Sequence, residues 1–200
     1  MAHGPRPDVA AFVVALLACV VTSVTASAAP RQQAGTVPIN QEAQLIVDFQ
    51  KRAQEYADLH RKLDGTLPDL PKPPSPAQVD AHERALTRLI AQARGRAQHG
   101  DIFTKESRAY FRRQIAHALS GPDAGQVRDS IMDENPGRIR LRINGRYPDE
   151  IPRSTMPPQL LAALPKLPEE LEYRFIGDRL ILLDFHANLV VDYIDDALPR

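Results

Sequence analysis

The stretch of this sequence whose residue types could most readily do chemistry is an alternating run of arginine and apolar side chains. The run reads RIRLRINGRY, and its arginines are Arg138, Arg140, Arg142 and Arg146. If the run is a strand, its period-two alternation places all four guanidinium groups on one face. Guanidinium groups bind carboxylates and phosphates through two parallel hydrogen bonds. The pattern therefore predicts either an anion-binding face or a face neutralised by acidic residues elsewhere in the chain.

Three acidic residues near the C-terminus are the expected counter-charges of this arginine face. Glu172, Asp184 and Asp192 belong to apolar-rich runs that we expect to form strands beside the arginine run. Opposite charges on adjoining strands contribute roughly 0.2 to 1 kcal/mol for each pair. If these pairs form, they explain the arginines without a ligand. The anion-site interpretation instead needs the arginines to be exposed, unpaired and convergent.

A metal site is a further interpretation of the acidic residues. Asp184 and His186 lie two positions apart, and Asp192 can lie across from them on the next strand. Two carboxylates and one imidazole are ligands found in metal sites, so these three residues are weak metal-binding candidates. The pair His82 and Glu83 begins like a zinc-protease helix, but the second histidine of that motif is absent.

Other signs of catalysis are missing from the sequence. There is no serine in a Gly-x-Ser-x-Gly turn, no glycine-rich phosphate loop after a strand and no Walker sequence. The remaining histidines along the helical segments are dispersed, and we expect surface or half-buried positions for His60, His82, His99 and His117. The residues therefore favour a protein that is not an enzyme and needs no cofactor.

The N-terminus has the pattern of a secretory signal peptide, which we assign to residues 1–28. A short basic leader precedes the apolar run VAAFVVALLACVVTSV, and the small residues Ala26 and Ala28 suit cleavage after Ala28. A lipoprotein signal at Cys19 and an uncleaved anchor are the less favoured alternatives, because the run is short for a bilayer span. Cys19 is the single cysteine, so we expect no disulfide in the exported chain. After cleavage of the signal peptide, we also expect no stable membrane span.

Residues 29–134 have the periodicity of helices. The first helix is expected from the N-cap Asn40 to Gly65, and the second follows a capping box at Ser75 and Gln78. The third begins at Thr104, and a short fourth helix is expected between positions 123 and 132. The prolines of residues 66–76 indicate an extended connector between the first two helices.

Residues 135–200 change to the period of strands. The run RIRLRI is expected to be a strand, PPQLLAAL a short helix, and residues 171–194 a three-stranded meander. If both hairpins have three-residue loops, one face of the meander is wholly apolar. That face would carry Leu171, Tyr173, Phe175, Ile181, Leu183, Phe185, Leu189, Val191 and Tyr193. The predicted fold class is α+β, with three to four helices followed by a small, largely antiparallel four-stranded sheet.

The meander also resembles a known module. The elements that carry the resemblance are Leu167 and Pro168, then Tyr173, Gly177, a strand to Asp184 and a last strand ending at Ile194. They resemble the C-terminal meander of secreted bacterial proteins related to the periplasmic nickel/cobalt homeostasis regulators, and of similar exported families. The likeness covers about thirty residues of turn and core chemistry. It implies a shared module and compartment more strongly than a shared activity.

These observations set an order among the functions. Lysine plus arginine and aspartate plus glutamate both total 25, so no bulk charge favours a nucleic-acid partner. The favoured interpretation is a periplasmic or secreted protein that acts as a non-catalytic binding or structural module of the envelope, with a partner that the sequence does not identify. The second is an anion-binding module that uses the arginine face. The third is a metal-dependent hydrolase.

Overall fold

The computed structural model describes residues 39–134, 139–153 and 155–199, and in them the predicted α+β class is confirmed. The predicted signal peptide and Cys19 lie outside the described residues. Four helices come first: α1 (Ile39–Asp64), α2 (Pro76–Ala93), α3 (Lys105–Ala118) and α4 (Ala124–Glu134). The strands β1 (Gly145–Arg146), β2 (Leu171–Ile176), β3 (Arg179–Asp184) and β4 (Leu189–Ile194) follow, with helix α5 (Pro158–Ala163) between β1 and β2.

Helices α2 and α3 begin directly after their predicted capping residues, whereas α1 begins at Ile39, so the prediction of Asn40 as its N-cap is wrong. The side chain of Ser75 accepts a hydrogen bond from the backbone N–H of Gln78, and the side-chain Oε1 of Gln78 accepts one from the backbone N–H of Ser75, so the predicted capping box is present. Thr104 caps α3 in the predicted place. Within the described ranges, no helix is both long enough and apolar enough to cross a membrane.

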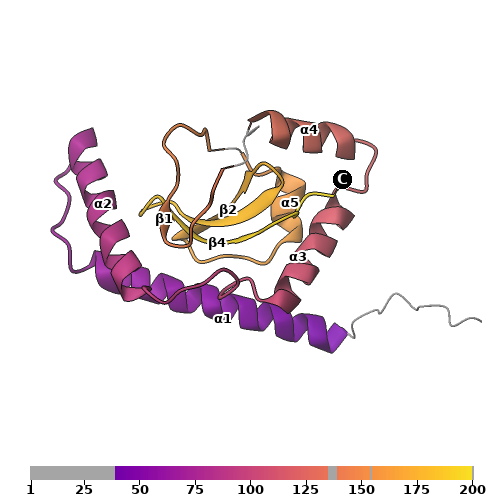
Figure 1. The fold of residues 1–200 in the computed structure, drawn as a ribbon, viewed down its shortest axis with the longest axis horizontal. Coiled ribbons are helices and arrows are strands. Elements are labelled where there is room, and N and C mark those ends of the chain that lie inside the picture. The colour runs from indigo at the N-terminus through magenta and orange to yellow at the C-terminus, as the bar shows by residue number, and fades with distance from the viewer. Residues whose placement is uncertain (1–38, 135–138, 154, 200) are drawn as a thin grey trace, which may run out of the picture. The chain divides into compact units, whose positions relative to one another are not determined.

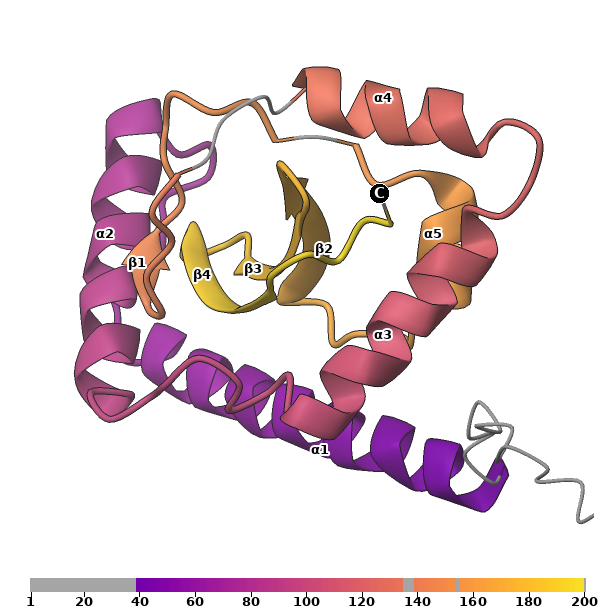
Figure 2. The ribbon, with the colours of Figure 1, turned by 45° about the vertical axis from the view of Figure 1, so that its right-hand side comes forward.

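The four strands form one antiparallel sheet in the order β1, β4, β3, β2, which leaves β1 and β2 at its edges. Helices α2, α1 and α3 follow one another around the sheet in Figures 1 and 2, and α5 lies beside β2. The core between helices and sheet holds three mutually packed rings, those of Phe49, Phe103 and Phe111. One face of the sheet thus packs against the helices.

The predicted register of the meander is wrong, because the first hairpin has two loop residues rather than three. Ile176 pairs with Arg179, and Gly177 occupies the turn with a φ of 58°, a value that suits glycine. The shorter loop moves the side chains of β3 to the opposite faces. Leu180 and Leu182 therefore join Tyr173 on the helix side, while Ile181 and Leu183 face the other way.

This register is stable because the second face of the sheet is covered as well. Ile181 and Leu183 are fully buried there, together with Tyr147. The segments just before and just after β1 cover these residues, in particular through the half-buried Ile139, Leu141 and Ile151. The sequence predicts a mixed second face, half wet and half covered, whereas Ile181 and Leu183 on that face are fully buried.

The predicted strand RIRLRI is also wrong in extent. Only Gly145 and Arg146 pair with β4, opposite Val190 and Leu189. The backbone N–H of Gly145 donates to the carbonyl of Arg142, and Asn144 adopts a φ of 58°, so the chain turns immediately before it pairs. A Cβ at Gly145 would lie 2.9 Å from the Arg142 carbonyl oxygen, which explains the glycine. The alternating arginine and apolar residues of this run therefore belong to the segment that covers the second face of the sheet.

Candidate functional site

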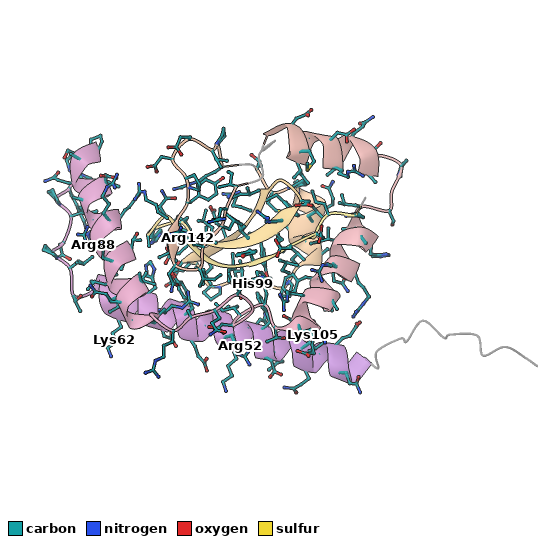
Figure 3. All side chains as sticks on the ribbon, viewed as in Figure 1. Arg52, Lys62, Arg88, His99, Lys105 and Arg142 are labelled. Atoms are coloured by element: carbon teal, nitrogen blue, oxygen red, sulfur yellow. The ribbon has the colours of Figure 1, made fainter. Side chains whose placement is uncertain are left out.

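The predicted arginine face is divided in the structure. Arg138 lies outside the described residues. Arg140 and Arg142 are exposed and form no ion pair with any described residue, and Figure 3 shows Arg142 at the surface. Arg146 instead reaches three carboxylates, those of Asp80, Glu83 and Asp149, at 3.3, 3.7 and 3.1 Å. Arg146 is thus neutralised within the fold, whereas Arg140 and Arg142 face solvent.

The counter-charges predicted for the arginines are engaged elsewhere. Glu172 forms two hydrogen bonds with Arg174 of its own strand, at 2.9 and 2.6 Å. Asp184 and Asp192 are completely buried on the helix side of the sheet. The predicted ion pairs between these acids and the described arginines of the run are therefore wrong, because Asp184 and Asp192 lie on the helix side of the sheet and Glu172 is bound by Arg174.

Asp184 binds helix α1 to the sheet. Its Oδ2 accepts hydrogen bonds from the hydroxyl of Tyr56 at 2.6 Å and from Nδ1 of His60 at 2.5 Å. Its Oδ1 accepts from the backbone N–H groups of His186 and Ala187. The donors satisfy both carboxylate oxygens, as a buried charge requires.

The burial of this network alters the acidity of its members. Burial alone lowers the pKa of His60, but the hydrogen bond and charge of Asp184 outweigh it, so that pKa is raised. Burial, reinforced by Asp184, raises the pKa of Tyr56 well above its ordinary value. His60 was expected at a surface or half-buried position, yet only 2% of it is exposed. The signal that places it inside is its position four residues after Tyr56 in the buried stripe of α1.

Asp192 holds a loop rather than a helix. Its oxygens accept from the backbone N–H groups of Gly100, Ile102 and Phe103 at 3.0, 2.9 and 2.9 Å. The weak metal candidates Asp184 and Asp192 thus belong to separate hydrogen-bond clusters. In the described ranges, no group of three or more histidine, cysteine, aspartate or glutamate side chains is arranged to hold a metal ion.

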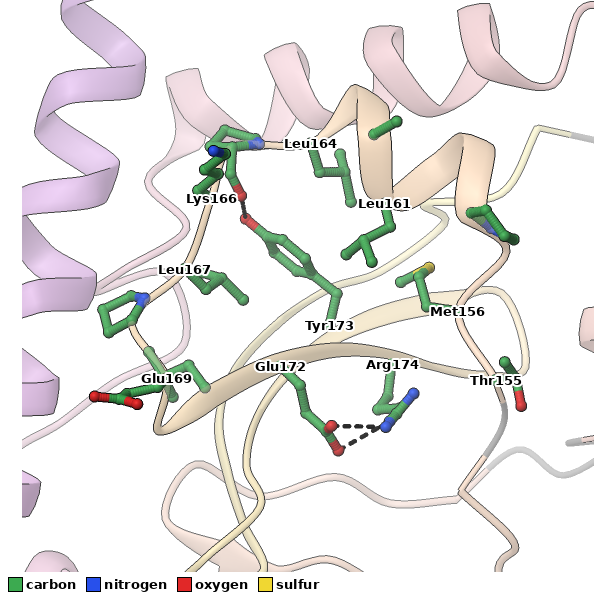
Figure 4. A pocket seen from close by; sticks show the side chains of 15 residues that line it. Thr155, Met156, Leu161, Leu164, Lys166, Leu167, Glu169, Glu172, Tyr173 and Arg174 are labelled. Carbon is green, nitrogen blue, oxygen red and sulfur yellow. Dashed lines mark hydrogen bonds and ion pairs between the residues drawn. The ribbon is translucent and has the colours of Figure 1, made fainter.

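A concave surface beside β2 forms a groove with a volume of about 730 Å³. Figure 4 shows it between β2, helix α5 and the segment that joins them. Its side chains are mainly apolar and include Met156, Leu161, Leu164, Leu167 and Tyr173. Leu161 is 55% exposed, one of two large apolar side chains as open as this in the described part. We call this surface the β2 groove.

Strand β2 presents the backbone of Tyr173 to the groove. The two-residue turn makes Ile176 and Arg179 a hydrogen-bonded pair, and such pairs alternate along an antiparallel ladder. Tyr173, opposite Leu182, is therefore in a non-hydrogen-bonded position, and its backbone N–H and C=O point away from β3. No described residue forms a backbone hydrogen bond with Tyr173 on that side. One strand-pairing position is thus free at the centre of β2.

The side chains on the two faces of β2 differ in polarity. The ring of Tyr173 points toward α5, and its hydroxyl donates to the carbonyl of Pro165 at 3.0 Å. Glu172 and Arg174 point to the opposite side of the strand in Figure 4. One face of β2 is thus apolar at its centre, and the other face carries one acid and one base. The groove could not be predicted from the sequence, because the walls of the groove come from elements whose packing no local pattern encodes.

Comparisons with models of protein families, with curated proteins and with solved structures found no match to this chain. The resemblance of the meander to the nickel/cobalt homeostasis regulators therefore stays an expectation from the sequence.

Proposed function

We propose that this protein is a non-catalytic binding module of the bacterial envelope, and that its β2 groove receives an extended segment of a protein partner. The single observation that carries the proposal is an apolar groove beside a sheet edge whose central residue, Tyr173, directs both backbone polar groups outward. An extended peptide that adds to an open edge gains main-chain hydrogen bonds there, and pockets for alternate side chains provide specificity.

The geometry of strand addition defines what the segment must supply. Residues directly opposite one another on adjoining strands point to the same face. The residue that pairs with Tyr173 therefore directs its side chain into the groove, next to Leu161 and Leu167. An apolar side chain removes that surface from water, which contributes roughly 1.5 to 3 kcal/mol if its burial is complete.

A pair of positions on the surface allows a matched test. A photo-crosslinking amino acid at position 161 lies in the groove, whereas one at position 47 lies on α1 with nearly the same exposure, 56% against 55%. In the living host, we expect a discrete protein adduct from position 161 and none from position 47. Mass spectrometry of the adduct then identifies the partner. Equal adducts from both positions, or none from position 161, would contradict the proposal.

Export is the second part of the proposal, and the N-terminal pattern supports it. The apolar run before Ala26 and Ala28 is typical of a signal peptide. In the envelope fraction of the host, we expect mass spectrometry to find a mature N-terminus at or near Ala29. A full-length chain in the cytoplasmic fraction, or an acylated Cys19, would overturn this part.

An anion-binding function is the second candidate, and the exposed, unpaired side chains of Arg140 and Arg142 favour it. Retention of the protein on a heparin or phosphate resin at low salt tests it, because salt screens such contacts. We expect the variant with both Arg140→Ala and Arg142→Ala to elute earlier if these residues bind anions. A control with Arg88→Ala, an exposed arginine of α2, should then elute like the unmodified protein.

A further inference from the structure

The charges that flank Tyr173 complement their own reversed copy. Glu172 precedes Tyr173 and Arg174 follows it, and these two side chains, which hydrogen-bond to each other, point to the side of β2 opposite the ring of Tyr173. If two copies of β2 pair antiparallel with Tyr173 opposite Tyr173, the residue opposite Glu172 is Arg174 of the second copy. The residue opposite Arg174 is likewise Glu172 of the second copy. Each flanking position thus meets the opposite charge.

The backbone satisfies the same register. Tyr173 points its N–H and C=O outward, and two such residues facing each other form the closely bonded pair of an antiparallel ladder. Two hydrogen bonds then join the strands at the symmetry axis. A shift of the register by one residue would place the outward groups of Tyr173 against a residue whose groups point away. Charge and hydrogen bonding therefore select one alignment.

We propose that the segment received by the β2 groove is strand β2 of a second copy of this chain, which gives a symmetric dimer with one continuous sheet. This inference rests on the proposed function, in which the groove receives an extended segment. The two-fold axis stands perpendicular to the sheet at Tyr173, so the same surface serves in both copies, as in an isologous dimer. Both grooves then lie on one side of the joined sheet, and the exposed Leu161 of each copy borders the junction.

Charge reversal provides a test that does not depend on one variant. Glu172→Arg places two arginines opposite two arginines, and Arg174→Glu places two glutamates opposite two glutamates. We expect each variant alone to self-associate about fivefold or more weakly than the unmodified protein, because two attractive cross-strand pairs become two repulsive ones. Sedimentation over a range of protein concentrations measures the association.

Two further samples separate lost pairing from lost folding. A mixture of the Glu172→Arg and Arg174→Glu variants has opposite charges at both flanking positions, and we expect the mixed dimer to form. The double variant, with both reversals in one chain, is again complementary to itself, and we expect it to dimerise. Thermal unfolding followed by circular dichroism confirms that each chain is folded.

The outcomes distinguish this inference from the proposed function. A protein that stays monomeric at all concentrations, or variants that dimerise as well as the unmodified protein, would overturn self-pairing through β2. In that case an adduct of a different protein from position 161 would leave the proposed function standing with another partner. An adduct between two copies, together with recovery in the mixture, would support both.

Discussion

At the scale of single residues, the buried carboxylate of Asp184 connects α1 to the sheet. It accepts from Tyr56 and His60 of the helix and from two backbone N–H groups of its own hairpin. Hydrogen bonds to a charged group are worth roughly 1.5 to 3 kcal/mol, about twice the value for neutral partners. The network should therefore dominate the response of the protein to small substitutions in this region.

Two tyrosines allow a comparison of charged and neutral acceptors. Tyr56→Phe removes a hydrogen bond to the carboxylate of Asp184, and Tyr173→Phe removes one to the carbonyl of Pro165. We expect Tyr56→Phe to lower the free energy of unfolding by about 1.5 to 3 kcal/mol and Tyr173→Phe by about 0.5 to 1.5 kcal/mol. Urea unfolding measures both. An equal loss in the two variants would contradict the charged character of the Asp184 contact.

The raised pKa of His60 makes stability depend on pH. Its stabilising charge faces Asp184, with Asp64 and Glu170 also near. A group whose pKa rises on folding contributes its full stability below its unfolded pKa, about 6.5 for histidine, and loses it as pH rises through the folded value. The free energy of unfolding should therefore fall as pH rises through this window, and His60→Gln should remove that part of the fall.

Urea unfolding on either side of the window, with His117→Gln as the control, checks this prediction. His117 is exposed on α3 and does not take part in the buried network of Asp184, so its replacement should leave the decline intact. Parallel pH profiles for the unmodified protein and His60→Gln would show that the histidine carries no such linkage.

Sequence patterns can place His60 on the buried stripe of its helix, but they cannot name its acceptor. Asp184 follows it by 124 residues, in a run that reads as an ordinary strand end. Which of the acids near the C-terminus is buried depends on a hairpin loop of two or three residues. The two-residue loop exchanged the faces of β3 and so moved Asp184 to the helix side. A bulge between β3 and β4 then places Asp192 opposite Leu182 on the same side, away from the arginines.

At the scale of elements, the loop between α2 and α3 depends on a side chain from β4. Asp192 accepts from the N–H groups of Gly100, Ile102 and Phe103, which no helix or strand satisfies. The caps and periods of the helices were predictable, because Ser75 and Thr104 stand next to the residues they cap. The loop was not, because its acceptor is about ninety positions away.

Replacement of this acceptor should act locally. In Asp192→Asn one oxygen becomes a donor, so we expect the amide hydrogens of Gly100, Ile102 and Phe103 to lose about 1 to 3 kcal/mol of protection. Hydrogen exchange followed by mass spectrometry or NMR reports on these amides. Asp195→Asn is the control, since Asp195 pairs with the side chain of Arg179 instead. Unchanged exchange in Asp192→Asn would contradict this role.

At the scale of the whole described chain, the sheet has two covered faces made from different parts of the sequence. The helices cover one face, and the chain around β1 covers the other. The α+β class follows from the change of period near residue 135, which the sequence shows directly. The second cover does not, because the run RIRLRI alternates as a strand does, although only its continuation at Gly145 and Arg146 pairs.

A fragment of residues 134–200 tests the dependence of the sheet on its helices. It keeps the second cover but loses α1, α2 and α3, which leaves the helix-side residues of the sheet, such as Tyr173 and Leu182, open to water. Small sheets need such a cover for independent stability. We expect the fragment to aggregate during purification, as light scattering would show. A soluble fragment with cooperative unfolding would mean that the two parts fold independently.

The separation of His60 and Asp184 along the chain also determines how long α1 lacks its partner during synthesis. The ribosome makes α1 first and β3 almost last, and 124 residues separate the two partners. At about 5 to 20 residues per second, roughly 6 to 25 s pass before the acceptor emerges. Throughout that interval the stripe that ends in Tyr56 and His60 has no sheet to pack against. A nascent chain of this protein should therefore bind chaperones that shield amphipathic helices.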